Sequence, residues 1–193
     1  AEDPRTITFA LPSEPPSLDP QLGTDTASAQ VTNNIMDPLV VLRGSSLRPV
    51  PNLASGWTVS GGGKVYTIHL RRTGRWTNGS RVTAHDFEYS WKRQMDPASK
   101  NPYSSYFYDI KGAEAFNKGK VPDASQVGVV AKNDWTLEVT LEGPRGYFPV
   151  LSAYLAAYPA HRASVEKHGD KWTEAANIVC NGPFALESWE HNK

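Results

Sequence analysis

Residues 66–95, YTIHLRRTGRWTNGSRVTAHDFEYSWKRQM, decide how this chain folds. In the first part, Tyr66, Ile68 and Leu70 alternate with polar residues, which is the period of a half-buried β-strand. A turn rich in Asn and Gly follows Trp76. The first half of the stretch therefore predicts a strand that enters a turn, with one face of the strand packed on a core.

The second half of the stretch predicts a helix. Thr83 stands three residues before Asp86, a spacing typical of an N-cap that satisfies free backbone N–H groups. Phe87, Trp91 and Met95 repeat at i, i+4 and i+8, so they share one helix face. A proline two residues beyond Met95 ends the helix, because the residue before proline avoids the helical region. This segment is typical of a scaffold, since it contains no catalytic constellation.

The bulk composition is that of a soluble globular protein. The chain has 193 residues, enough for one sizeable domain or two small ones. Its 20 Lys and Arg residues balance its 20 Asp and Glu residues, so no basic patch for nucleic acid is expected. No apolar run approaches the length of a membrane span.

The two other compositional signals concern the chain start and the cysteine count. Ala1-Glu2-Asp3-Pro4 fits a mature N-terminus left after removal of a signal peptide, and equally an artificial boundary. Cys180 is the only cysteine, which excludes an internal disulfide. We expect a plain buried thiol at this position.

Patterns elsewhere in the chain predict a mixed α/β architecture, or an α+β one, with antiparallel hairpins. Strands are expected over Thr6–Leu11 and 39–42, and hairpins over 57–70 and over 127–131 with 135–141. Helices are expected over 27–36, 110–117, 148–157 and 163–168; the first would be capped by Thr26 or Ser28, with Val31 and Ile35 facing inward. A loop is expected over 44–51, and extended segments over 179–181 and 184–186.

The residues with catalytic or metal-binding potential form no known constellation. The five histidines make no H-x-x-x-H or H-E-x-x-H pattern, and no cysteine pair supports a zinc site, so we expect no metal or other cofactor. A nucleophile elbow, a P-loop and a dinucleotide-binding motif are absent as well. Asp86 and Glu88 would make a poor acid–base pair, because side chains at i and i+2 of a helix point apart. The sequence predicts a protein without enzymatic activity.

The aromatic residues are the remaining signal, since six tryptophans and eight tyrosines exceed what a small core needs. Trp57, Trp76 and Trp91 lie at strand, turn and helix positions and are expected in the core. Residues 101–106, NPYSSY, are instead a loop with tyrosines, which combine a large contact area with a polar tip. This loop, with Tyr103, is a candidate for ligand contact.

Several short motifs together resemble the N-terminal part of the extracytoplasmic oligopeptide-binding proteins, in the peptide/nickel-type (family 5) solute-binding proteins of ABC importers. They run in family order over nearly the whole chain. These motifs are SLDP (17–20), PNLASGW (51–57), YTIHLR (66–71), WTNG (76–79), VTAHDFEYSW (82–91), PYSSY (102–106), LEVTL (137–141), EKHGDKW (166–172) and NIVCNGPF (177–184).

The resemblance implies the first lobe of a two-lobed, periplasmic-binding-protein-like clamp that closes on its ligand by a hinge. It covers roughly the first third of a typical member, so the second lobe would be absent and the chain would be an N-terminal fragment. The expected division is 1–45 as a first segment of lobe I, 46–158 as a subdomain with hairpins and helices, and 159–193 as a return segment of lobe I.

By position, the resemblance also implies ligand-binding residues. The cleft-lining segment of the family falls at Thr24, Asp25 and Thr26, and a cleft acidic residue of peptide-binding relatives falls at Thr24. The tyrosine of the family's Pro-Tyr motif falls at Tyr103. The implied ligand is an oligopeptide held through its backbone, as in strand addition, with side chains in roomy, hydrated pockets.

The resemblance further implies an ABC-transporter permease as partner. It implies an extracytoplasmic location, in the periplasm or at the outer face of the cell membrane. The parent protein would be secreted or a lipoprotein, and through it the chain would associate with the cell envelope. Within the class, a dipeptide, an oligosaccharide, a metal chelate or a small metabolite stays open as ligand. The alternatives from other classes are a carbohydrate-binding module or carbohydrate-active enzyme that uses exposed tryptophans, and a structural interaction module.

Overall fold

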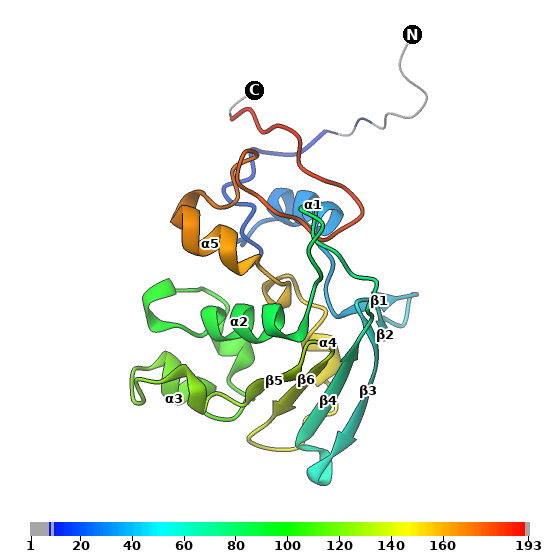
Figure 1. Cartoon of the computed structure of the whole chain (residues 1–193), viewed down its shortest axis with the longest axis vertical. Helices are drawn as coiled ribbons and strands as arrows, with labels where there is room; N and C mark the ends of the chain where they lie inside the picture. Colours follow the sequence, from blue (N-terminus) through cyan, green and yellow to red (C-terminus); the bar gives the residue numbers. More distant parts are fainter. Residues whose placement is uncertain (1–7, 9, 192–193) are drawn as a thin grey trace.

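Figure 1 shows the chain as a computed structural model in which residue 8 and residues 10–191 are described. The helices are α1 (Thr26–Ile35), α2 (Ala84–Gln94), α3 (Ala113–Asn117), α4 (Phe148–Leu151) and α5 (Arg162–His168). The strands are β1 (Val40–Arg43), β2 (Arg48–Pro51), β3 (Ala54–Ser60), β4 (Val65–Leu70), β5 (Val129–Asn133) and β6 (Thr136–Thr140). Short 3-10 helices lie at Gly61–Gly63, Pro97–Ser99, Ser104–Phe107, Ala124–Gln126, Leu155–Ala157 and Gly169–Lys171. The fold is mixed α/β with antiparallel sheets, as the sequence predicted.

The main sheet has the antiparallel order β3-β4-β6-β5. On β4, the side chains of Tyr66, Ile68 and Leu70 are buried, whereas His69 is exposed. Ile68 lies opposite Trp57 of β3 and Leu137 of β6, so the predicted strand is the second of the four. The 57–70 hairpin and the 127–141 hairpin are both confirmed.

Helix α2 lies against β5 and β6 (Figure 1) and supplies two of the largest fully buried side chains, Trp91 and Phe87. Its N-terminus carries the predicted capping box, in which Asp86 Oδ2 accepts from the Thr83 backbone N–H at 2.7 Å. Phe87, Trp91 and Met95 have no exposed surface, as their spacing predicted. Burying a side chain of this size contributes about 1.5–3 kcal/mol, so this face of α2 anchors the fold.

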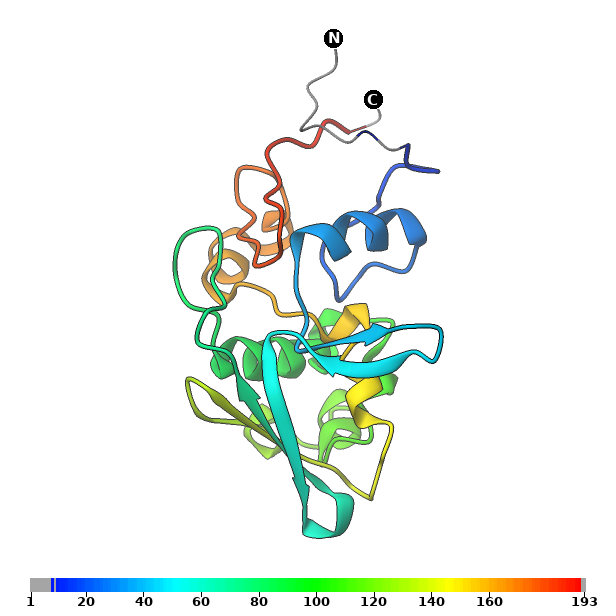
Figure 2. The same ribbon diagram turned by 90° about the vertical axis from the view of Figure 1, so that its right-hand side faces the viewer.

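The buried apolar residues form two clusters. The larger one gathers residues between Leu39 and Ala157 around the sheet and α2. The smaller one combines the two ends of the chain, with Leu18, Ile35, Met36, Tyr158, Ala160, Trp172 and Cys180. Figure 2 shows the corresponding arrangement, in which α1 and the segment that returns after α5 lie at one end and the sheet at the other. Cys180 is 1% exposed, so the prediction of a buried thiol is confirmed.

One predicted loop is instead a strand. Residues 44–51 were expected to be irregular, but Arg48–Pro51 forms β2 and pairs with β1 in a separate two-stranded ribbon. Proline lacks an amide donor, yet Pro49 and Pro51 are tolerated here because β2 pairs on one edge only. The turn between the strands uses positive φ at Gly44 (70°) and Leu47 (49°).

Two predicted helices are shorter than their apolar pattern indicated. The 148–157 segment is α4 followed by a separate 3-10 turn, because Tyr154 is extended (ψ 147°) and breaks the helix between them. The 110–117 segment is helical only from Ala113, because Ile110 forms a bridge with Leu141 and Gly112 has φ 72°. In both places a contact with a distant segment outweighs local helix propensity.

The remaining predictions concern the chain ends. The 27–36 and 163–168 helices are confirmed as α1 and α5, and Gly169 ends α5. The strand expected over Thr6–Leu11 lies largely outside the described residues, and its described positions, 8, 10 and 11, are in no strand. None of the helices among the described residues combines the length and apolar character that a bilayer crossing needs.

Candidate functional site

Three tyrosines, Tyr103, Tyr106 and Tyr154, form an aromatic cluster on the surface. The ring of Tyr103 lies 5.5 Å from that of Tyr106 and 5.3 Å from that of Tyr154, and the last two rings are 5.4 Å apart. Tyr106 is 48% exposed and Tyr154 is 37% exposed. Aromatic rings that remain this exposed offer apolar area and hydroxyl groups to a ligand at a low cost in side-chain entropy.

A buried amide pair fixes the loop that carries Tyr103. Gln94, at the end of α2, and Asn101 exchange two side-chain hydrogen bonds of 2.7 and 2.8 Å. Asn101 Oδ1 also accepts from the backbone N–H of Tyr103 at 3.1 Å, and Ser104 Oγ donates to the Gln94 carbonyl at 2.9 Å. Because these groups are buried and fully paired, the loop holds Tyr103 in one position before any ligand arrives.

The third tyrosine is held through a different residue of α2. Tyr154 lies in the extended break after α4, and the 3-10 turn that follows it is tied to α2 by Trp91 Nε1, which donates to the Ala157 carbonyl at 2.8 Å. Burial, together with the hydroxyl of Tyr103, raises the pKa of Tyr154. The hydroxyl therefore stays protonated at physiological pH.

The second predicted segment, Thr24, Asp25 and Thr26, forms the start of α1. The cap of this helix is Asp25 and not Thr26 or Ser28 as the sequence predicted. Its Oδ1 accepts from the Ser28 backbone N–H at 2.8 Å and its Oδ2 from Ser28 Oγ at 2.7 Å. The prediction was wrong because three neighbouring residues all have capping side chains, and only the backbone path selects among them. Thr24 and Thr26 are exposed.

The Asp25 carboxylate therefore has a structural role. Replacing Asp25 with Ala should lower the free energy of unfolding by about 0.5–2 kcal/mol, because α1 loses its cap. Burial alone would raise the pKa of Asp25, but the hydrogen bonds from Ser28 lower it overall. The contribution of the charge should thus be present above the unfolded-state pKa and be lost as pH falls through the lower folded-state value.

Chemical denaturation at pH 7 measures this loss, and Asp25→Asn is the matched control because Asn is an equally good cap. If Asp25→Ala unfolds at the wild-type denaturant concentration, the capping role is refuted.

Residues 154 and 155 lie between the two segments predicted to bind ligand, which are the start of α1 and the Tyr103 loop. A Cβ placed on Gly23 would lie 3.6 Å from Leu155 Cδ2, so the loop before α1 packs on Leu155. The next residue back, Tyr154, contacts Tyr103. The start of α1 and the Tyr103 loop thus lie on two sides of one short segment.

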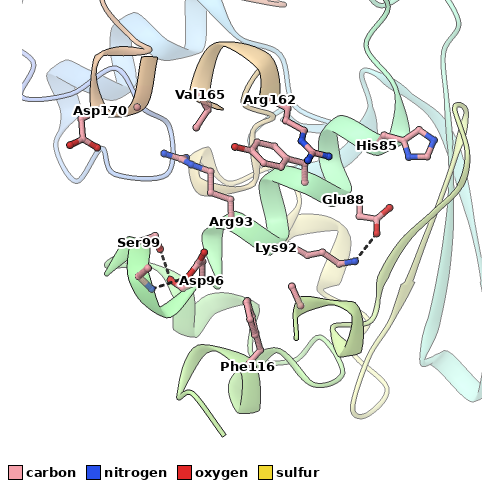
Figure 3. Close-up of a pocket in the computed structure, with 14 residues that line it drawn as sticks. His85, Glu88, Lys92, Arg93, Asp96, Ser99, Phe116, Arg162, Val165 and Asp170 are labelled. Carbon is pink, nitrogen blue, oxygen red and sulfur yellow. Dashed lines mark hydrogen bonds and ion pairs between the residues drawn. The ribbon is translucent and has the colours of Figure 1, made fainter. Parts of the chain in front are cut away.

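A cavity of about 690 Å³ lies apart from the tyrosine cluster, along α2 and against α5 (Figure 3). The Lys and Arg side chains that line it are already paired. Lys92 Nζ lies 2.6 Å from Glu88 Oε1, Arg93 binds Asp19, and Arg162 pairs with Glu166 and covers the ring of Tyr89 at 5.4 Å. Because its lysine and arginine side chains are engaged with carboxylates, this cavity offers a ligand fewer free groups than the tyrosine cluster does.

The two carboxylates weighed as an acid–base pair are occupied as well. Asp86 serves the cap of α2, and Glu88 binds Lys92 and accepts from the Ala131 backbone N–H at 2.9 Å. Among the described residues, no group of three His, Cys, Asp or Glu side chains gathers closely enough to hold a metal ion.

Comparison with protein families identifies the group to which the chain belongs. The model of the bacterial extracellular solute-binding proteins, family 5 (middle part), matches residues 48–193. The chain is a member of this family. The match begins at β2 and includes the sheet, α2 and the tyrosine cluster.

Known relatives of this family 5 chain match nearly all of it. The chain is 45% identical over 183 residues to the dipeptide-binding protein DppE of Bacillus subtilis, and the alignment covers 93% of the chain and 33% of DppE. It is 39% identical over 185 residues to the periplasmic oligopeptide-binding protein OppA of Escherichia coli, covering 94% of the chain and 33% of OppA.

A crystal structure of the substrate-binding domain of an oligopeptide ABC transporter from Bacillus anthracis superposes on the family 5 chain with a TM-score of 0.88 and 40% identity. The superposition covers 93% of the chain and 35% of the Bacillus anthracis structure. The chain thus spans about a third of the length of the relatives it matches.

Sequence reasoning missed Tyr154 as a member of the cluster, and it included Tyr106 in the candidate loop without naming it as a site residue. Tyr106 belongs to the same NPYSSY loop as Tyr103, so its position in the loop was an available signal. Tyr154 gave none, because it lies within an apolar run that was interpreted as a buried helix.

Proposed function

We propose that this chain is part of the first lobe of an extracytoplasmic solute-binding protein that captures oligopeptides for an ABC importer and has no enzymatic activity. The observation that supports this most directly is the preorganised tyrosine cluster of Tyr103, Tyr106 and Tyr154, on a fold shared with peptide-binding relatives. Such a surface can hold a peptide while backbone groups of the protein bind the peptide backbone.

In this proposal, Thr24, Asp25, Thr26 and Tyr103 belong to the ligand-binding edge of the lobe. Thr24 and Thr26 offer exposed hydroxyls, whereas Asp25 acts through the shape of the α1 start. A permease is the partner that would receive the ligand, and the protein would act at the cell envelope, outside the cytoplasm, as a secreted protein or lipoprotein. Lobe II would close over this edge.

We also propose a division of the lobe at residues 45/46 and 158/159. The two apolar clusters support a division near these positions, since the larger one runs from Leu39 to Ala157 and the smaller one joins residues up to Met36 to residues from Tyr158 onward. The first boundary falls in the turn between β1 and β2, so the connection there is a tight hairpin turn rather than a free linker.

The carbohydrate-binding or carbohydrate-active alternative is not favoured. It needs exposed tryptophans, yet the large exposed aromatic side chains among the described residues are Tyr106, Tyr147, Tyr154 and Phe184. The named relatives above are peptide-binding proteins, which also disfavours it.

Replacing Tyr103 with Ala should weaken peptide binding by about 1 kcal/mol or more, because an aromatic anchor at the centre of the cluster is lost. Calorimetric titration of the full-length protein with mixed tri- to pentapeptides measures this. Tyr103→Phe separates the hydroxyl from the ring. Tyr147→Ala is the control, because Tyr147 is 51% exposed and lies outside the cluster.

Two results would count against the proposal in different ways. If Tyr103→Ala binds peptides with unchanged affinity, Tyr103 has a structural role and does not contact the ligand. No heat and no thermal shift of the wild type with any peptide would remove the oligopeptide assignment.

A further inference from the structure

A cavity of about 410 Å³ lies between α1, β1 and the segment that follows α4. Figure 2 shows α1 and the β1–β2 ribbon on the same side of the molecule, with the 148–158 segment beside them. The lining side chains include Ala29 and Asn33 of α1, Val41 and Leu42 of β1, and Tyr154 and Tyr158. Its volume falls within the range of about 300–1,000 Å³ that is typical of small-ligand sites.

Five of the eight lining residues are apolar, and the polar ones are Asn33 and two tyrosines, Tyr154 and Tyr158. The Tyr158 hydroxyl lies 3.0 Å from Asn33 Oδ1. Burial and the nearby charge of Asp37 raise the pKa of Tyr158 to about 12, so this hydroxyl stays protonated and donates to the amide oxygen. Asn33 Nδ2 has no hydrogen-bond partner in the described part of the chain and is a free donor at the cavity wall.

The cavity is continuous with the candidate ligand site. Tyr154 lines the cavity and also belongs to the tyrosine cluster, with its ring 5.3 Å from that of Tyr103. Leu155, another lining residue, packs against Gly23 in the loop before α1. A ligand that rests on the cluster can therefore extend one of its side chains past Tyr154 into the cavity.

We propose that this cavity is a selective subsite that takes a bulky, uncharged apolar side chain of the bound peptide, with Asn33 Nδ2 donating to a carbonyl oxygen of that peptide. The inference rests on the proposed function, because it needs a peptide on the tyrosine cluster. Lys, Arg, Asp and Glu are disfavoured, since Val41 and Leu42 in the cavity wall offer no partner for a charge. Small side chains bind less tightly because they leave the cavity partly empty.

The test uses the full-length protein and tetrapeptides in which Leu, Phe, Ala, Asp or Lys is placed at each position in turn on an alanine background. For the wild type, we expect one position at which Leu or Phe binds about tenfold more tightly than Lys or Asp. Leu42→Glu places a carboxylate in the cavity wall, so Lys should gain about tenfold relative to Leu at that same position.

Leu47→Glu is the matched control. Leu47 belongs to the same ribbon and is 63% exposed, but it does not line the cavity. A second variant, Ala29→Leu, fills the cavity from α1 and should make Ala the preferred residue at the selective position. If Leu42→Glu does not fold, Ala29→Leu alone tests whether the cavity is the selective subsite.

The outcomes separate the two proposals. If the wild type binds peptides but shows no selective position, or if Leu42→Glu and Ala29→Leu keep the wild-type preference, the subsite is refuted and the peptide-binding function stands. If the wild type binds none of the peptides, the proposed function fails and the subsite fails with it.

Discussion

Replacing Asp19 with Ala should lower the free energy of unfolding by about 3–5 kcal/mol, the loss expected when one partner of a buried ion pair is removed. The Asp19 side chain is 4% exposed, and its Oδ2 lies 2.6 Å from Arg93 Nη2. The same oxygen accepts from Trp172 Nε1 at 3.1 Å, and Oδ1 accepts from the Gln21 backbone N–H at 3.0 Å. The substitution leaves a charged group and two other donors without their acceptor.

This network links three parts of the chain. Asp19 and Gln21 precede α1, Arg93 belongs to α2, and Trp172 belongs to the return segment. Gln21 Nε2 adds a further contact to α2 by donating to the Ser90 carbonyl. Because the two apolar clusters are otherwise separate, the network is a main polar connection between the ends of the chain and the sheet domain.

Chemical denaturation with guanidinium measures the expected loss, and Glu166→Ala is the control. Glu166 also pairs with an arginine, Arg162, but both side chains are more than half exposed, so the cost should be at most about 1 kcal/mol. Asp19→Asn should fall between the two, because it keeps an acceptor oxygen and loses the charge. A change of under about 1 kcal/mol for Asp19→Ala would refute the role of the network.

The SLDP motif shows what the sequence could and could not reveal about this network. The motif contributed to the resemblance, yet its aspartate has partners that lie 74 and 153 positions away in the chain. No local rule pairs residues at such distances. By contrast, the capping box of Thr83 and Asp86 and the alternation of Tyr66 to Leu70 depend on neighbours a few residues apart, so both were predicted correctly.

The candidate site divides in the same way. Tyr103 was identified because its loop is polar, rich in turn residues and part of a recognisable motif. Its partner Tyr154 was hidden, because an apolar run predicts a buried helix unless a distant contact interrupts it. The 148–157 segment is interrupted at Tyr154 by an extended residue, and the 3-10 turn that follows binds α2.

The contact that holds this turn leads to the second large effect. Trp91 has no exposed surface, its Nε1 donates to the Ala157 carbonyl at 2.8 Å, and its ring lies 5.9 Å from Phe107 and 6.0 Å from Phe148. Trp91→Ala should cost about 3–5 kcal/mol, because it removes a large core side chain and leaves a cavity. Thermal or chemical unfolding measures this loss.

Trp91→Phe separates packing from hydrogen bonding. It keeps an aromatic ring against Phe107 and Phe148 but leaves the buried Ala157 carbonyl without its donor, at a cost of about 1–3 kcal/mol. Ala157 ends the turn that begins directly after Tyr154. We therefore expect Trp91→Phe to weaken peptide binding as well, although Trp91 lies inside the core and contacts no ligand.

Trp135→Phe is the matched control, because Trp135 lies between β5 and β6, is only partly buried and stacks with Arg72 rather than with the 152–158 segment. It should leave peptide affinity at the wild-type value. If Trp91→Phe also binds peptide with wild-type affinity while it is measurably less stable, the position of Tyr154 does not depend on this hydrogen bond. Among the contacts that support the tyrosine cluster, the Gln94–Asn101 pair, which fixes the Tyr103 loop, would then be the one on which ligand affinity depends.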